Sequence, residues 1–352
     1  MPTTSRPHLF ALLLAALLPL AGCGAEADPE ARGGETDARP VVGVSIPAAT
    51  HGWPAGVGWW AEQAMAEYPD IDWQFQRASR ATDQASQVET MVQQGLDALV
   101  ILPFDSDTPL SAVRRAKDRD VYVVSVDRGL RQPIADLYVA GDNRAFGRIS
   151  AEYMVERLNF QGNIVILRGM QVEIDEERYQ AAMEVFNAHP GIEVLDAQHG
   201  NWNRKDALEV MQTFLTKHDD IDAVWASDDD MALGVEQALR ETGRTDEMWI
   251  LGGAGMKDIV QRVMEGDDLY PADVTYPPAM IAAGIHLAAA QVLHDGDEQA
   301  VAENIPAHLG LNTADLHGPG ESTGDEQRNL TLPVHLVTPD NAEDYYFPDS
   351  VY

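Results

Sequence analysis

The chain has 352 residues, enough for two domains of ordinary size, and 45% of them are hydrophobic, as in a typical globular protein. Its 24 lysines and arginines stand against 57 aspartates and glutamates, which gives a formal net charge of −33. A surface this acidic disfavours a nucleic-acid partner, because phosphate groups are bound by basic surfaces. General disorder is disfavoured as well, since the apolar fraction supports a buried core.

The N-terminal segment has the pattern of a secretory lipoprotein signal. A basic residue precedes an unbroken apolar run at 9–18, which is too short to span a bilayer comfortably. Leu-Ala-Gly-Cys at 20–23 is similar to the bacterial lipoprotein box, in which the cysteine is lipidated after cleavage. We expect residues 1–22 to be removed and Cys23, the only cysteine, to carry the lipid; an ordinary secretory peptide with an incidental cysteine is the alternative. Residues 23–40 show no apolar period and predict a flexible tether, so we expect the folded part in the periplasm or cell envelope.

From residue 41 onward, apolar runs of strand length alternate with segments of helical period, which predicts parallel sheets with helices on both faces. Strands are expected at 41–46, 71–75, 98–102, 121–126 and 137–140, and then at 163–167, 192–197, 223–226, 248–251 and 272–276. Helices are expected near 54–68, 88–95, 110–118, 144–158, 175–188, 204–217, 230–242, 257–265 and 278–294. Two sets of about five strands are better explained by two lobes than by one very wide sheet. The predicted fold class is therefore α/β, with two doubly wound parallel-sheet lobes.

The last part of the chain breaks this alternation. Residues 313–330 are polar and glycine-rich and predict a surface loop. Residues 330–337 predict a closing strand, and residues 339–352 form an aromatic-containing tail.

Polar and aromatic side chains gather just after the predicted strands. In open parallel sheets the ligand binds outside the carboxyl ends of the strands, so residues at these ends are candidates for a site. Asp127 and Arg128 are the clearest example, because an acid and a base follow the apolar strand 121–126 with no spacer. Other strand ends bring to the same edge His51, Trp53, Phe104, Arg178, Trp202, Asn203, Asp228, Ala254 and Tyr276.

This combination of side chains suits a sugar or a polyol. The C–H faces of such ligands pack on aromatic rings, while Asp, Asn and Arg form planar forks for neighbouring hydroxyls. Each residue also has a purely structural explanation: Trp53 and Trp202 as core aromatics, Asn203 as a helix cap, and Asp127 with Arg128 as a structural ion pair. Their joint position at one sheet edge is what favours a binding site.

Several separate stretches, in the same order along the chain, resemble one known family. They are ATHGWPAGV, LVILPFDSD, VSVDRGL, YVAGDN, GNWNRKDALEVMQTFL, AVWASDDDMALGVEQAL and GGAGMKD. Over 41–337 the chain resembles the ribose-type periplasmic sugar-binding proteins, which have the type I periplasmic-binding-protein fold and supply ABC importers. The resemblance implies two lobes that close on one sugar and are joined by crossovers near 142–145, 272–276 and 330–334. It assigns the N-terminal lobe to residues 41–143 plus 273–312 and the C-terminal lobe to residues 144–272 plus 331–352.

The resemblance also carries the family's sugar contacts onto this sequence. They fall on His51, Trp53, Asp127, Arg128, Arg178, Trp202, Asp228 and Tyr276. The sequence departs from the family where Gly253-Ala254 replaces an aromatic-Asp pair, where Leu102 replaces a polar residue, and where His51-Gly52-Trp53 replaces Asn-Pro-Phe. An acceptor lost at Ala254 leaves one sugar hydroxyl unpaired, at a cost of ~1–3 kcal/mol. Ribose is therefore a doubtful ligand, and we expect another pentose, a deoxy sugar or a polyol.

The predicted function is that of a monomeric, lipid-anchored receptor that binds a monosaccharide or polyol and delivers it to an ABC permease by hinge closure. Catalysis, a cofactor and a metal are not expected: the Gly-rich stretch 251–258 lacks the third glycine of G-x-G-x-x-G, and SDDDM at 227–231 lacks the spacing of a calcium loop. A sugar-sensing transcriptional regulator would need a DNA-binding unit where this chain has a signal and a tether. Presentation of the sugar to a chemoreceptor or sensor kinase is the open alternative.

Overall fold

The computed structural model describes residues 39–49, 52–311 and 327–352. The predictions for the signal, for lipidation of Cys23, for His51 and for nearly all of the loop at 313–330 concern residues outside these ranges.

The first lobe is built on a six-stranded sheet. Its strands are β1 (Val41–Pro47), β2 (Asp72–Ala78), β3 (Ala98–Ile101), β4 (Tyr122–Val126), β5 (Leu137–Gly141) and β11 (Arg328–Leu332). They lie in the order β11-β5-β4-β3-β1-β2, and every neighbouring pair is parallel. The predicted doubly wound arrangement of this part of the chain is confirmed.

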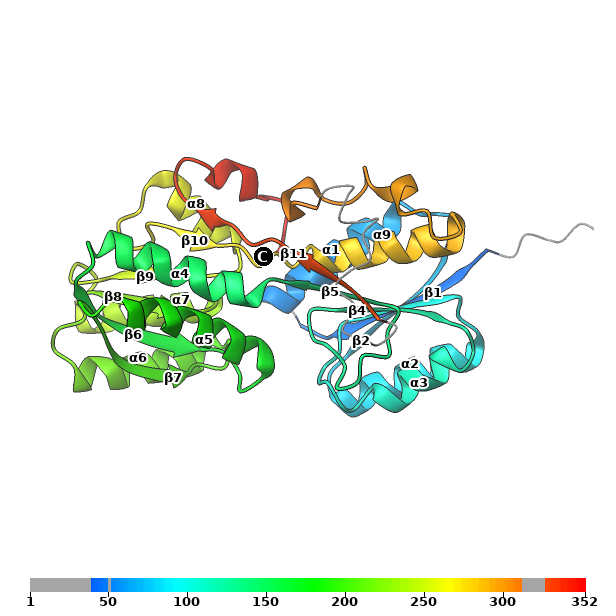
Figure 1. The fold of residues 1–352 in the computed structure, drawn as a ribbon, viewed down its shortest axis with the longest axis horizontal. Helices are drawn as coiled ribbons and strands as arrows, with labels where there is room; N and C mark the ends of the chain where they lie inside the picture. Colours follow the sequence, from blue (N-terminus) through cyan, green and yellow to red (C-terminus); the bar gives the residue numbers. More distant parts are fainter. Residues whose placement is uncertain (1–38, 50–51, 312–326) are drawn as a thin grey trace, which may run out of the picture. The chain divides into compact units, whose positions relative to one another are not determined.

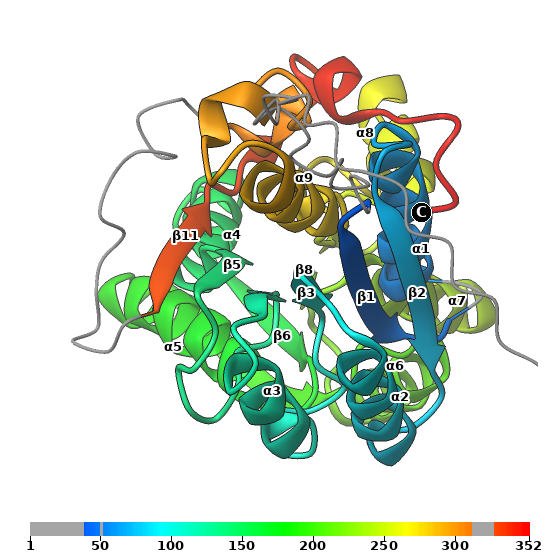
Figure 2. The same cartoon turned by 90° about the vertical axis from the view of Figure 1, so that its right-hand side faces the viewer.

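Helices cover both faces of this sheet (Figures 1 and 2). They are α1 (Gly52–Ala66), α2 (Ala81–Gln94), α3 (Leu110–Lys117) and α9 (Met280–Leu293). In β3, Leu99 and Ile101 belong to the apolar cluster formed with α2 and α3, whereas Ala98 and Val100 belong to the cluster with α1 and α9. Successive side chains of a strand point to opposite faces, so a continuous apolar run is the sequence pattern of a strand covered on both sides.

The second lobe is built on a four-stranded parallel sheet in the order β7-β6-β8-β9. Its strands are β6 (Gly162–Arg168), β7 (Ile192–His199), β8 (Ala223–Ala226) and β9 (Trp249–Leu251). Its helices are α4 (Asn143–Arg157), α5 (Glu173–Ala188), α6 (Arg204–Lys217), α7 (Asp229–Thr242) and α8 (Lys257–Glu265). Helix α4 packs on α5, and α6 packs on α7 (Figure 1).

Within its described residues, the chain passes between the two sheets three times. Strand β5 leads directly into α4, and α8 leads through β10 (Asp273–Val274) into α9. Strand β11 continues into β12 (Leu336–Val337), which pairs antiparallel with β10. The described residues also include short 3₁₀ turns at η1 (Glu298–Val301), η2 (Ala307–Leu309) and η3 (Ala342–Tyr345).

The end of the chain differs from its prediction. One closing strand was expected at 330–337, but the structure has β11 and β12 separated by residues 333–335. Pro333 has no N–H to donate, so the pairing of β11 with β5 ends before it. Strand β11 also begins at Arg328, inside the stretch expected to be a loop, and its last two residues lie in the first sheet, although residues from 331 onward were expected in the second lobe. The other lobe boundaries stay predictions. Within residues 39–49, 52–311 and 327–352, no helix combines the length and the apolar character that crossing a bilayer requires.

Candidate ligand-binding site

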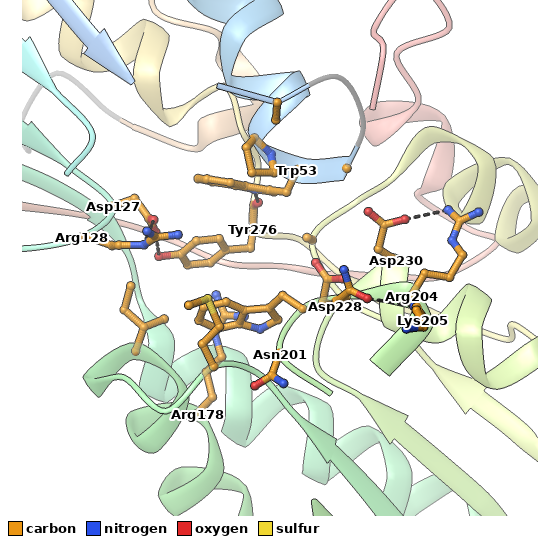
Figure 3. A pocket seen from close by; sticks show the side chains of 18 residues that line it. Trp53, Asp127, Arg128, Arg178, Asn201, Arg204, Lys205, Asp228, Asp230 and Tyr276 are labelled. Atoms are coloured by element: carbon orange, nitrogen blue, oxygen red, sulfur yellow. Dashed lines mark hydrogen bonds and ion pairs between the residues drawn. The ribbon is translucent and has the colours of Figure 1, made fainter. Parts of the chain in front are cut away.

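A cavity of ≈ 680 Å³ is lined by residues of both lobes (Figure 3). Predicted site residues on its wall are Trp53, Asp127, Arg128, Arg178, Trp202, Asn203, Asp228, Ala254 and Tyr276. The wall also contains Ala49, Gly52, Pro54, Met170, Ile174, Asn201, Arg204, Lys205 and Asp230. Because the carboxyl ends of both parallel sheets supply these residues, the cavity lies where the topology predicts a ligand site. The roles of the individual residues in binding stay predictions.

The pair formed by Asp127 and Arg128 is loose. Arg128 Nε lies 3.9 Å from Asp127 Oδ2, while Asp127 Oδ1 accepts a hydrogen bond from the Tyr276 hydroxyl at 2.9 Å. The Arg128 guanidinium is held instead by the carbonyl oxygen of Phe104, which accepts from Nη1 at 2.6 Å. Burial raises the pKa of Asp127, and nearby Arg128 and the Tyr276 hydroxyl oppose that rise. Oδ1 is therefore occupied within the protein, whereas Oδ2 meets Arg128 only at 3.9 Å. Phe104 is not on the wall, and its backbone carbonyl holds Arg128.

Arg178 is held between aromatic rings. Its Cζ lies 4.2 Å from the centre of the Phe146 ring and 4.3 Å from that of Tyr276. Its Nε donates to Asn143 Oδ1 at 2.9 Å, and its Nη1 donates to the Ser227 carbonyl oxygen at 3.3 Å. Only 5% of the residue is exposed, so these contacts fix the guanidinium in place before any ligand arrives.

The two tryptophans are placed differently. Trp53 lies in the first turn of α1, and its Nε1 donates to the Tyr276 carbonyl oxygen at 2.8 Å. Trp202 lies against Gly169, where a Cβ would overlap the indole ring, so only glycine leaves room for it. The Trp202 N–H is buried and has no acceptor among the described residues. Both tryptophans line the cavity, and Figure 3 labels Trp53 on its wall.

The side chains of the three consecutive aspartates after β8 have different hydrogen-bond partners. Asp228 is the N-cap of α7 and accepts from the Met231 amide at 3.1 Å. Asp229 accepts from the Gly253 and Met256 amides, and Asp230 accepts from Arg204 Nη2 at 2.6 Å. Burial, assisted by the neighbouring charge of Asp230, raises the pKa of Asp228 to about 7. In the described part of the chain, no three His, Cys, Asp or Glu side chains are grouped to hold a metal ion.

Backbone strain accompanies the cavity. Asp127, Asn201, Trp202 and Ala254 have positive φ values of 63°, 56°, 51° and 102°, although none of them is glycine. Such conformations cost ~1–3 kcal/mol each and concentrate at functional sites. Ala254 is held by its amide, which donates to the Val274 carbonyl oxygen at 2.7 Å, and its methyl group brings no hydrogen-bond acceptor to the wall.

Some wall residues were missed by sequence reasoning. Met170 and Ile174 are apolar residues of the connection after β6 and of the start of α5, and nothing in their spacing marks a site. Arg204 and Asp230 lie in the polar runs after β7 and β8 that the sequence already places at this sheet edge, and Asn201 stands next to the predicted Trp202. His51 lies outside the described residues.

Comparison with known proteins gives the same architecture. The sequence model of the family described as "Periplasmic binding protein domain" matches residues 42–297. The ribose import binding protein RbsB of Bacillus subtilis is 32% identical over 234 residues, which cover 66% of this chain and 74% of that protein. A xylitol-binding protein of Mycolicibacterium smegmatis is 36% identical over 186 residues, or 52% of this chain, so the match spans only 53% of that relative. A solved ABC transporter solute-binding protein from Bacillus halodurans with bound myo-inositol has a TM-score of 0.72 at 23% identity, covers 90% of this chain and 100% of its own, and shows the shared fold.

The two parallel sheets with a cavity between them have the type I periplasmic-binding-protein fold. The chain belongs to the periplasmic binding protein domain family, whose members act outside the cytoplasm as binding proteins and not as enzymes.

Proposed function

We propose that this protein binds a sugar or a polyol in the cavity between its lobes and delivers it to an ABC importer. The observation that carries the proposal is the convergence on one cavity of aromatic rings and hydrogen-bonding forks from both lobes (Figure 3). Relatives named for xylitol binding and ribose import support the same ligand class. Capture occurs when the ligand meets one lobe, and rotation of the second lobe then buries it.

The proposed contacts are of two kinds, aromatic rings and hydrogen-bonding side chains. Trp53 and Trp202 pack on the C–H faces of the ligand, and Asp127 Oδ2, Arg128 and Asp228 engage its hydroxyls. The Tyr276 hydroxyl occupies Oδ1 of Asp127, and the Ala254 side chain brings no acceptor to the wall. These two acceptors are not available to a ligand. Their absence favours a ligand with fewer ring hydroxyls, which means a deoxy sugar, or one with a flexible chain, which means a polyol.

A thermal-shift screen followed by calorimetry tests this function. Pentoses, deoxy sugars, hexoses and linear polyols are compared with charged amino acids, because a ligand that binds only the folded protein raises Tm. We expect a shift with at least one uncharged polyhydroxy compound. A shift with charged amino acids alone would show that the ligand class is wrong.

The proposal includes export and attachment to the membrane through a lipid on Cys23. Its support is the signal and the Leu-Ala-Gly-Cys sequence at residues 20–23. Metabolic labelling of cells with an alkyne fatty acid should mark the wild-type protein and leave the Cys23→Ser variant unlabelled. Equal labelling of the two proteins would place the lipid elsewhere, and no labelling of either would favour a freely released protein.

A further inference from the structure

One carboxylate of the second lobe lies on the cavity wall against the first lobe and is not among the proposed sugar contacts. Asp230 is the second residue of α7, and its Oδ2 is so close to the Gly52 backbone that a Cβ on Gly52 would overlap it. Its other oxygen, Oδ1, accepts from Arg204 Nη2 at 2.6 Å. The two oxygens of Asp230 therefore face different lobes: Oδ1 faces an arginine of its own lobe, and Oδ2 faces the first residue of α1.

The environment of Oδ2 suits an anion. Helix α1 has 15 residues, and its unpaired N–H groups give its start a partial positive charge. Its own first turn contains no acidic residue that would balance this charge. The carboxylate of Asp230 supplies the negative charge from the other lobe.

The side chains of Asp230 and Arg204 differ in how much of their surface is exposed. The Asp230 side chain is only 12% exposed, whereas that of Arg204 is 52% exposed. Burying a carboxylate is costly unless partners replace its water, and the half-exposed Arg204 replaces water at Oδ1 only. The start of α1 is the part of the first lobe that faces Oδ2, so this burial depends on contact between the lobes.

We propose that Asp230 is an interlobe latch, which means that its carboxylate holds the two lobes together through the start of α1, with Arg204 as the residue that positions it. The proposal rests on the proposed function of ligand capture by lobe closure. Figure 3 places Asp230 and Arg204 at the opposite end of the cavity from Arg128, beside the start of α1. The latch stabilises the closed form whichever hydroxyls the ligand carries.

The latch makes a kinetic prediction. A carboxylate at a helix start is worth about 2-fold to about 30-fold in an equilibrium, depending on its burial. A ligand escapes after the lobes separate, so loss of the latch speeds dissociation by this factor and leaves association nearly unchanged. Asp230→Asn removes the charge and keeps the shape, and Arg204→Gln removes the positioning partner, whose side chain is 52% exposed.

The chain offers a matched control. Asp83 forms a comparable pair with Arg80, at 2.7 Å, on the surface of the first lobe and away from the cavity wall. Asp83→Asn therefore removes the same charge and the same type of ion pair without touching the contact between the lobes.

The first measurement is stopped-flow tryptophan fluorescence with xylitol, D-ribose and 2-deoxy-D-ribose, since Trp53 and Trp202 line the cavity. For every probe that binds, we expect Asp230→Asn to raise the dissociation rate by a similar factor and Asp83→Asn to change nothing. If Asp230→Asn raised the dissociation rate of D-ribose and left that of 2-deoxy-D-ribose unchanged, Asp230 would contact a ligand hydroxyl, and the latch would be overturned.

The second measurement needs no ligand. Spin labels on the exposed helix positions Thr90 in α2 and Thr213 in α6, introduced as cysteines in a Cys23→Ser background, report the distance between the lobes. Asp230→Asn should shift the distance distribution to longer values, and Asp83→Asn should not. If none of the three probes binds the wild-type protein, the proposed ligand class is in question, while identical distributions in Asp230→Asn and wild type would overturn the latch alone.

Discussion

Replacement of Asp228 by Asn should make the stability of this protein less sensitive to pH. Burial and the neighbouring Asp230 raise the pKa of Asp228 from 3.8 to about 7, so the folded state holds a proton that the unfolded state releases. A carboxyl group of this kind contributes its full stability at a pH below its pKa in the unfolded chain. That contribution is lost as the pH rises through its pKa in the folded protein. Since one pKa unit equals ~1.4 kcal/mol, ionisation of Asp228 costs the folded state up to ~4 kcal/mol.

The variant Asp228→Asn isolates this effect. Asn keeps a side-chain oxygen for the Met231 amide and is an equally good N-cap, so α7 is preserved. The free energy of unfolding is measured by urea denaturation from about pH 4 to about pH 8.5. The difference between the variant and the wild type should be small near pH 4, grow by ~1.4 kcal/mol per pH unit in favour of the variant, and level off above about pH 7.

The exposed Asp258, in the first turn of α8, provides the matched control as Asp258→Asn. The difference in the free energy of unfolding between this variant and the wild type gives the baseline for removing one carboxyl group from a helix start. If the Asp228→Asn curve ran parallel to this baseline at every pH, burial of Asp228 would not control its ionisation and the reasoning would be refuted.

Three further predictions concern the cavity and its support. Asp127→Ala and Arg128→Ala should abolish sugar or polyol binding in calorimetry while Tm in the absence of ligand stays within a few degrees; undiminished affinity in both would remove them from the site. Tyr276→Phe frees Asp127 Oδ1, so the ligand screen should shift toward compounds with one more hydroxyl, and an unchanged ranking would contradict that role. Gly147→Ala should lower the free energy of unfolding by ~1–3 kcal/mol, because the new methyl group overlaps the Arg178 carbonyl oxygen where α4 meets α5; wild-type stability in urea denaturation would contradict this close approach.

Part of the site could be read from the sequence because the rule that locates it is topological. A buried strand that ends in Asp127 and Arg128 places both at the carboxyl edge of its sheet, and the same reasoning applies to Asp228 after β8. Phe104 follows the same rule and is not on the wall, because its contribution is a carbonyl oxygen that holds Arg128. Position along a strand indicates the edge and leaves open whether side chain or backbone faces the ligand.

The partners of each charge could not be predicted in the same way. Adjacent Asp127 and Arg128 suggest an ion pair, yet in the structure Oδ1 of Asp127 is taken by Tyr276, which is 149 residues away along the chain. Three neighbouring aspartates suggest one acidic cluster, yet the backbone of the first turn of α7 directs Asp229 to the loop after β9 and Asp230 to Arg204. Contacts of this range depend on how whole lobes pack.

The order of strands and helices, and the edge where polar residues collect, follow from local periodicity, and the sequence by itself determined them. Tertiary structure decided which oxygen of each carboxylate is free, why α1 meets an aspartate of the other lobe, and where β11 ends its pairing. The physical reason is that period and propensity act over a few neighbouring residues, whereas burial, charge compensation and interlobe contact are set by segments that meet only after both sheets have formed.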